Sequence, residues 1–143
     1  MAQFMDLDDG SISIVIRNKD KQEIGAFSFW PTDTGILGRY DKVIEALSAI
    51  KMPENADDVE NGAAAVVEAD NLIRKQFNYL LNGNVSEGIF AKCAPLTLTG
   101  NGDFYFENVM SGIAGLIEQH MGKRVKDKLA KIKAATAKYG KKK

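Results

Sequence analysis

The sequence contains one histidine and one cysteine, the side chains most often used as nucleophiles, general bases or soft metal ligands. His120 lies beside the apolar stripe of an expected helix, and Cys93 precedes Ala94-Pro95 in an apolar setting. A zinc site needs about four ligands, and a cysteine nucleophile needs a positioned base. We therefore interpret His120 as a partly buried helix residue and Cys93 as a small buried hydrophobe. We expect no catalytic residue, no metal and no cofactor.

Two acidic clusters and one glycine-rich segment are the other candidates for chemistry. Asp6, Asp8 and Asp9 precede Gly10 without the alternating ligands and closing glutamate of a calcium loop. The second cluster, residues 57–60, is typical of a helix N-terminus, where acidic side chains are favoured by the helix dipole. Residues 100–103 resemble a phosphate loop, but no Gly-Lys-Ser/Thr follows them. We interpret the acids as solvated charge and the glycine-rich segment as a turn.

The formal net charge of zero conceals two oppositely charged parts. Residues 1–122 contain nine basic and eighteen acidic side chains, whereas residues 123–143 contain ten basic and one acidic. Apolar positions recur between the lysines, so this segment is typical of a cationic amphipathic helix. The candidate contacts to an anionic partner are Lys123, Arg124, Lys126, Lys128, Lys131 and Lys133.

Such a basic helix has several interpretations. It can bind nucleic acid, an anionic membrane or an acidic protein surface, or it can simply pack its apolar side on the core. Aromatic residues are absent between Phe106 and Tyr139, so the segment offers no stacking platform for single-stranded nucleic acid. The same absence removes the aromatic anchors of a membrane-bound helix. A second copy of the acidic body is a further candidate partner.

The elements that position these residues follow from apolar periodicity. Isoleucines at 12, 14 and 16 alternate, and residues 23–30 form a second alternating run that stops at Pro31. This pattern predicts a β-hairpin over about residues 11–30. Two strands are marginally stable alone, so the hairpin must pack on other elements or pair with another chain.

The rest of the chain is predicted to be mostly helical. Three-to-four-residue spacing predicts helices over about 36–50, 56–82 and 103–122, and one turn of helix within 86–92. Residues 32–34 would cap the first helix, Asn82-Gly83-Asn84 would close the second, and Asp103 would be the N-cap of the last. The apolar side of the second helix is expected to include Val59, Ala63, Val66, Val67, Ile73, Phe77, Leu80 and Leu81.

These elements predict an α+β fold that is mostly α, in which a hairpin packs on a small helical bundle. Its length of 143 residues suits one domain, which we expect over 1–122, followed by a basic helical extension over 123–143. The acidic N-terminus does not resemble a secretory signal, and no stretch approaches about 18 uninterrupted apolar residues. We therefore expect a cytoplasmic protein without a membrane span.

The hairpin is also a candidate binding surface. Its strands have free edges, so another chain could pair with it by strand addition. Phe27, Phe29 and Trp30 are expected to be exposed there. The alternative for Trp30, which we favour, is a lid over the helical core.

Three segments together resemble the tail assembly chaperones of long-tailed bacteriophages, small proteins encoded beside the tape-measure gene. The first is Phe27-Ser-Phe29-Trp-Pro31-Thr-Asp33, with Arg39-Tyr40 in the helix that follows. The second runs from Asn71 to Phe90 and contains an amphipathic helix, a short polar loop and Val85-Ser-Glu-Gly-Ile-Phe90. The third is Phe104-Tyr-Phe106-Glu107. The resemblance covers about residues 11–120, and the basic end lies outside it.

The resemblance implies a non-enzymatic protein that binds the tape-measure protein, or tail-tube subunits, in the bacterial host cytoplasm. A chaperone for a long helical protein needs an apolar groove for amphipathic segments. Two alternatives remain: a nucleic-acid-associated protein that uses its lysine-rich helix, and a self-associating component of the virion. The candidate partner-binding residues are Phe27, Phe29, Trp30, Phe77 and Phe90.

Overall fold

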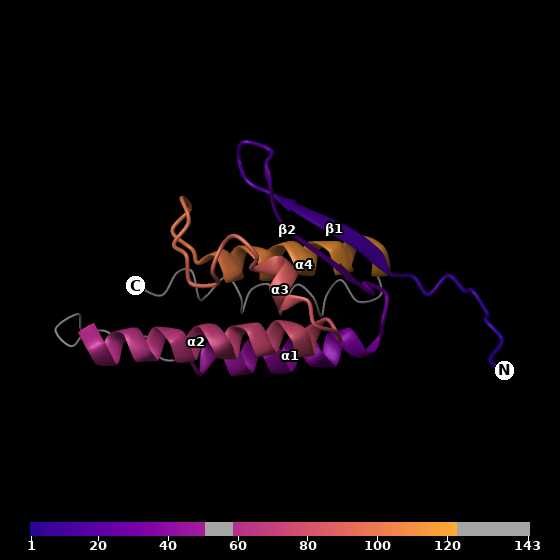
Figure 1. Ribbon diagram of the computed structural model, residues 1–143, viewed down its shortest axis with the longest axis horizontal. Helices are drawn as coiled ribbons and strands as arrows, with labels where there is room; N and C mark the ends of the chain where they lie inside the picture. The colour runs from indigo at the N-terminus through magenta and orange to yellow at the C-terminus, as the bar shows by residue number, and fades with distance from the viewer. Residues whose placement is uncertain (51–58, 123–143) are drawn as a thin grey trace.

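The computed structural model describes residues 1–50 and 59–122 (Figure 1). The α+β, mostly α class is confirmed: within these ranges one antiparallel hairpin accompanies four helices. The predicted segment 56–58 and the basic extension 123–143 lie outside the described residues. In chain order the elements are β1 (Ile12–Arg17), β2 (Glu23–Phe29), α1 (Gly35–Ser48), α2 (Val59–Leu80), α3 (Ser86–Ile89) and α4 (Tyr105–Met121).

The hairpin has one apolar face and one polar face. Ile14 pairs with Phe27 and Ile16 with Gly25, so the alternating isoleucines and phenylalanines share one side. The register shifts beyond Ile16, where Ile24 is the extra residue of β2. Figure 1 shows the hairpin lying along α4, with the pair α1 and α2 on the other side of that helix. The apolar face of the hairpin is therefore directed toward the helices.

The core lies between these layers. Tyr40 of α1 is fully buried, and its hydroxyl donates a hydrogen bond to the carbonyl oxygen of Met110 in α4 at 2.9 Å. A buried hydroxyl needs such a partner, because leaving it unsatisfied costs about 1–3 kcal/mol. The core also includes Phe27, Phe29, Ile36, Val43, Leu47, Ile73, Phe77, Leu80, Leu81, Ile89, Phe90, Phe106, Ile113 and Ile117.

The apolar side of α2 differs from the prediction. Ile73 and Phe77 are buried as expected, but Val66 and Val67 are 38% and 59% exposed. For Val66, which shares the face of Ile73 seven residues later, the reason is length: α2 has 22 residues and α1 has 14, a difference of about 12 Å at 1.5 Å per residue. Val67 is the next residue around the helix and lies off that face. The first turns of α2 therefore extend past α1 (Figure 1). The apolar periodicity of one helix contains no information about the length of its neighbour, so it could not predict this exposure.

Thr34 is the N-cap of α1 and Asn82 lies at the end of α2, both within the predicted capping segments, whereas the start of α4 differs from the prediction. α4 begins one residue later than Asp103 would require, with Phe104 as its N-cap. The Glu107 carboxylate accepts a hydrogen bond from the Phe104 backbone N–H at 2.9 Å, so the side chain that caps the helix comes from inside its first turn. At the end of α2, Asn82 adopts a positive φ of 56°, as its residue type predicted. α4 ends at Met121, and its C-cap is Gly122, whose φ is 73°.

Candidate partner-binding site

An apolar groove lies between the hairpin and α4. Its volume is about 490 Å³, and it is open to solvent along one side. The hairpin contributes Ile14, Ile16 and Ile24, each of them half-buried. Across from them α4 contributes Val109, Gly112, Ile113 and Leu116.

Two local features keep the groove from closing. Gly112 has no side chain, and no heavy atom lies within 4 Å of the position that a Cβ would take there. The irregularity in β2 adds Ile24 to the wall beside Ile16. The hairpin is meanwhile held against α3, because Gly25 and Gly88 allow the two backbones to approach closely. The hairpin therefore cannot simply move down onto α4.

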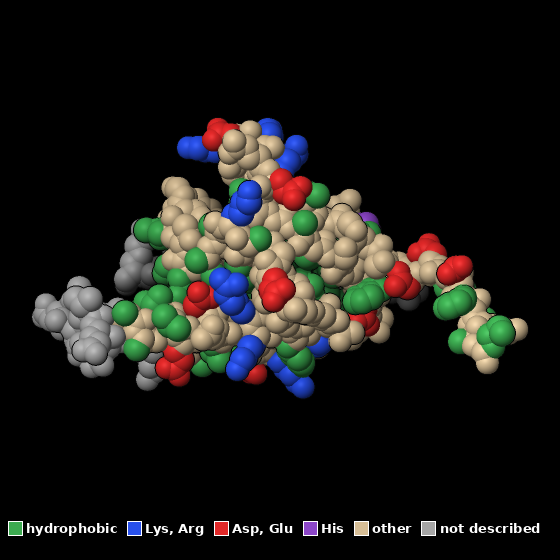
Figure 2. Space-filling model, viewed as in Figure 1, with side chains coloured by type: hydrophobic (Ala, Val, Ile, Leu, Met, Phe, Trp, Pro, Cys, Tyr) green, Lys and Arg blue, Asp and Glu red, His purple; other side chains and the backbone are tan. Residues whose placement is uncertain are grey.

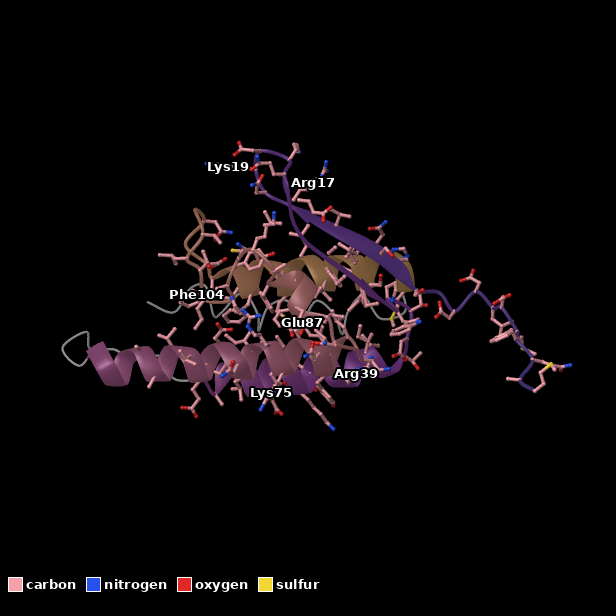
Figure 3. The ribbon with its side chains drawn as sticks, viewed as in Figure 1. Arg17, Lys19, Arg39, Lys75, Glu87 and Phe104 are labelled. Carbon is pink, nitrogen blue, oxygen red and sulfur yellow. The ribbon has the colours of Figure 1, made fainter. Side chains whose placement is uncertain are left out.

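The polar lining of the groove is sparse. Asn108 is engaged by other side chains: its Oδ1 accepts from Asn101 at 3.0 Å, and its amide donates to the Thr99 hydroxyl at 2.9 Å. Arg17 is exposed at the loop end of β1, and among the described residues no carboxylate forms an ion pair with it. Figure 3 shows Arg17 and Lys19 at that end of the hairpin. One end of an apolar groove is therefore positively charged.

The predicted partner-binding aromatics do not form this surface. The expectation that Phe27 and Phe29 are exposed is wrong: both rings are buried, because the face of β2 that carries them is the one packed on the helices. Phe27 reaches the site only as part of the groove wall. Phe77 and Phe90 are also buried, with their rings edge to face at 5.2 Å between centroids. Phe77 and Phe90 therefore belong to the core and do not line the groove.

Trp30 is half-buried, but among the described residues it is not one of the partly buried side chains that pack against the core, so the expected lid over the helical core is not observed. Its indole N–H donates to the Asp9 carboxylate at 2.8 Å. This hydrogen bond is the largest cause that lowers the pKa of Asp9 to about 2, and the Ser11 backbone N–H adds to it. Trp30 therefore connects the end of the hairpin to the segment that precedes β1.

The titratable residues considered for catalysis are dispersed. His120 is exposed near the end of α4, which corrects the expectation of partial burial, and Cys93 is half-buried as a free thiol. Burial raises the pKa of Tyr105 to about 12, and its hydroxyl donates to the Ile89 carbonyl oxygen. In the described part of the chain no group of three or more histidine, cysteine or acidic side chains could hold a metal ion. The basic candidates Lys123, Arg124, Lys126, Lys128, Lys131 and Lys133 lie outside the described residues.

The groove itself was not located from the sequence, although two signals for it were present. Gly112 interrupts a helical pattern, which indicates either a weak helix or a surface that another segment approaches closely. The three isoleucines of β1 predict an apolar face that other elements or another chain must cover. Neither signal indicates how far apart the hairpin and α4 lie, because that distance is set by the contact between Gly25 and Gly88.

The segments that carried the family resemblance are in mutual contact. Phe90 lies against Phe77 on one side and Tyr105 on the other, with centroid distances of 5.2 and 5.9 Å. Arg39 donates from Nε to the Leu80 carbonyl oxygen at 2.9 Å. The three segments therefore build one continuous part of the core.

The outer surface is otherwise mixed in character. Figure 2 shows charged side chains scattered over the visible face, with apolar side chains both on the projecting N-terminal segment and on the body, where α2 begins. Across the described residues, none of the helices combines the length and apolarity needed to cross a membrane. No protein-family model, curated protein or solved structure matches this chain.

Proposed function

We propose that this protein is a non-enzymatic assembly chaperone of a long-tailed bacteriophage, and that it binds an apolar, helix-forming segment of the tape-measure protein. The observation that supports the proposal is the open groove between the hairpin and α4. The resemblance of the three core segments to tail assembly chaperones indicates the class of partner. The proposed place of action is the cytoplasm of the bacterial host.

The chemistry of the groove suits such a client. Its walls are mostly aliphatic, so they bind apolar side chains without requiring a particular pattern of hydrogen bonds. Each apolar side chain buried from the client contributes about 1.5–3 kcal/mol before the cost of association is subtracted. Two or three such anchors yield reversible binding, which a chaperone needs if it is to release its client.

The proposal is tested by co-expression with a tape-measure fragment that aggregates when it is produced alone. The protein should keep the fragment in the soluble fraction, whether or not nuclease is present. Leu116→Lys places a charge on the groove wall from a half-buried position and should abolish this rescue. Leu72→Lys is the matched control, because Leu72 is 40% exposed on α2, away from the groove.

A second measurement, the retention of DNA, separates the proposal from nucleic-acid binding. A protein that uses its lysines on phosphates should retain DNA with an affinity that falls steeply with salt, and truncation after Gly122 should remove that retention. Failure to rescue the fragment, together with such salt-sensitive retention of DNA, would contradict the chaperone function.

A further inference from the structure

Residues 1–10 form an arm that projects from the body (Figure 1) and contains no helix or strand. Phe4, Met5 and Leu7 are 93%, 81% and 76% exposed. Large apolar side chains gathered on one exposed segment commonly mark a surface that another protein covers. Asp6 lies between Met5 and Leu7, and Asp8 follows Leu7, so the arm is both apolar and acidic.

The base of the arm is held by hydrogen bonds that direct the arm away from the groove of the same chain. Asp9 accepts the Trp30 indole N–H, and its second oxygen accepts the Ser11 backbone N–H at 3.0 Å. Gly10 between them has a φ of 79°, a conformation that favours glycine. These contacts hold the arm at the end of the hairpin opposite its loop, whereas the positive end of the groove is at Arg17, next to the loop.

β1 presents a free edge beside that groove. Among the described residues it pairs only with β2, whereas β2 has β1 along one side and contacts α3 through Gly25 and Gly88. An edge strand without proline exposes backbone N–H and C=O groups that another extended segment can satisfy. Val15, on the outer face of β1, is 54% exposed.

The charges of the arm and of this edge are complementary. Asp6 and Asp8 are acidic, while Arg17 at the end of β1 and Lys19 in the following loop are basic. Arg17 has Glu23 as its cross-strand neighbour but forms no ion pair with a described carboxylate. Attraction between the acids of the arm and the basic side chains at the end of β1 favours this segment as the partner and fixes its register along the strand.

We propose that the N-terminal arm of one copy binds to β1 of a second copy as an added strand. Side chains alternate along a strand, so Met5 and Leu7 share one face and enter the groove beside Ile14 and Ile16. Phe4 and Asp6 then lie on the outer face, the face of Val15. The arm and the edge are different surfaces of the same chain, so the contact is heterologous and builds rings or open chains.

The first test measures the mass of the full-length protein in solution by light scattering as its concentration rises. Deletion of residues 2–8 removes the arm and leaves the groove, whereas Gly112→Leu fills the groove and leaves the arm. Each variant alone should remain monomeric, and their equimolar mixture should form a heterodimer with one arm in one groove. Gly115→Leu is the matched control, because Gly115 also has open space around its Cβ position but does not line the groove.

The second test keeps the chain complete and exchanges the charges. Arg17→Glu alone and the double substitution Asp6→Arg with Asp8→Arg should each weaken self-association about tenfold or more. The protein that combines all three substitutions should regain association close to that of the unaltered chain. Circular dichroism spectra that match the unaltered chain would show that the variants are folded.

Two results would overturn the proposal. One is a wild-type protein that remains monomeric at every concentration, as expected if the arm folds back on β1 of its own copy. The other is self-association that persists after deletion of residues 2–8. Both measurements are made without a tape-measure fragment, so they are independent of the proposed chaperone function.

Discussion

Glu107 is a buried carboxyl group in the first turn of α4. One oxygen accepts the Phe104 N–H, whereas Oε2 has no hydrogen-bond partner among the described residues. Burial raises the pKa of Glu107 above its usual 4.5, and this effect exceeds the opposing one of the Phe104 hydrogen bond. A raised pKa means that the folded state binds the proton more tightly than the unfolded state does. The stability linked to that proton is present at low pH and is lost as the pH rises through the raised pKa.

Glu107→Gln should therefore stabilise the protein at pH 8 and have little effect at pH 4. Glutamine keeps an acceptor for the Phe104 N–H and removes the buried charge. Urea unfolding at the two pH values measures the difference. Glu107→Ala is the control: it loses the cap and should lower the free energy of unfolding by about 1 kcal/mol at pH 4, and by less at pH 8, where it also removes the buried charge. If Glu107→Gln were less stable than wild type at pH 8, the negative charge of Glu107 would be stabilised in the folded protein, and the prediction would be contradicted.

The Asp9 carboxylate has the opposite effect on how stability depends on pH. Its pKa in the folded protein is about 2, compared with an ordinary value of 3.8, mainly because of the Trp30 indole N–H. A lowered pKa contributes stability above pH 3.8, and that contribution is lost as the pH falls toward 2. The arm should therefore be released from Trp30 in this acidic range.

Trp30 is the only tryptophan, so its fluorescence reports this release directly. Emission should shift between pH 4 and pH 2 in the wild-type protein. In Asp9→Asn the transition should be absent, because an amide does not titrate in this range. Asp8→Asn should retain it, since Asp8 accepts the Gly10 backbone N–H and, among the described residues, does not contact Trp30. An unchanged transition in Asp9→Asn would assign it to another group.

At the scale of elements, the contact between β2 and α3 determines where the hairpin lies. A Cβ on Gly88 would overlap the Ala26 carbonyl oxygen, and a Cβ on Gly25 would lie 2.8 Å from the Gly88 carbonyl oxygen. Real side chains do not tolerate such approaches to a backbone. The two glycines are therefore required by the packing of the hairpin on α3.

Gly88→Ala should destabilise the protein by about 1–3 kcal/mol, the usual cost of overpacking a close contact. Thermal or urea unfolding measures the loss. The control is Gly38→Ala in α1, where nothing lies within 4 Å of the added methyl group. That substitution should stabilise the helix by up to about 1 kcal/mol. Equal stability of Gly88→Ala and wild type would show that α3 can move away without cost.

At the scale of the whole molecule, Arg39 joins three parts of the chain. Its Nη2 contacts the Asp33 carboxylate, between β2 and α1, at 2.9 Å, and its Nε donates to the Leu80 carbonyl oxygen at the end of α2. The hydrogen bond from Arg39, supported by the Gly35 N–H, lowers the pKa of Asp33. Arg39 also satisfies a carbonyl in the last turn of α2, which has no basic residue of its own.

Arg39→Ala should lower the free energy of unfolding by about 1–2 kcal/mol, because it leaves a carbonyl oxygen and a carboxylate without their partner. Asp70→Asn is the comparison: it weakens a single partly buried pair, the contact with Arg74 one turn further along α2, and should cost about 0.5 kcal/mol or less. Urea unfolding at low salt measures both. If Arg39→Ala lowered the free energy of unfolding no more than Asp70→Asn does, Arg39 would not be important for joining these parts of the chain.

Much of the local structure was predictable from the sequence. Alternating isoleucines in β1 and the apolar repeats of α1 and α4 specify strands and helices, because the periods of about 2 and 3.6 residues are properties of a single segment. Asn82 was recognised as a helix terminator for a similarly local reason. The N-cap of α4 was misassigned because Glu107 caps the helix from inside, in competition with Asp103 before it.

The candidate site was beyond the sequence because it depends on distances between segments. Periodicity marked Phe27 and Phe29 as one face of a strand, but only packing decided that this face is buried against the helices. It likewise marked Val66 as apolar without showing that α2 extends past α1. The sequence alone determined which residues share a face. The tertiary structure decided which faces are covered and which, like the groove beside Gly112, stay open, because coverage depends on how closely two backbones can approach.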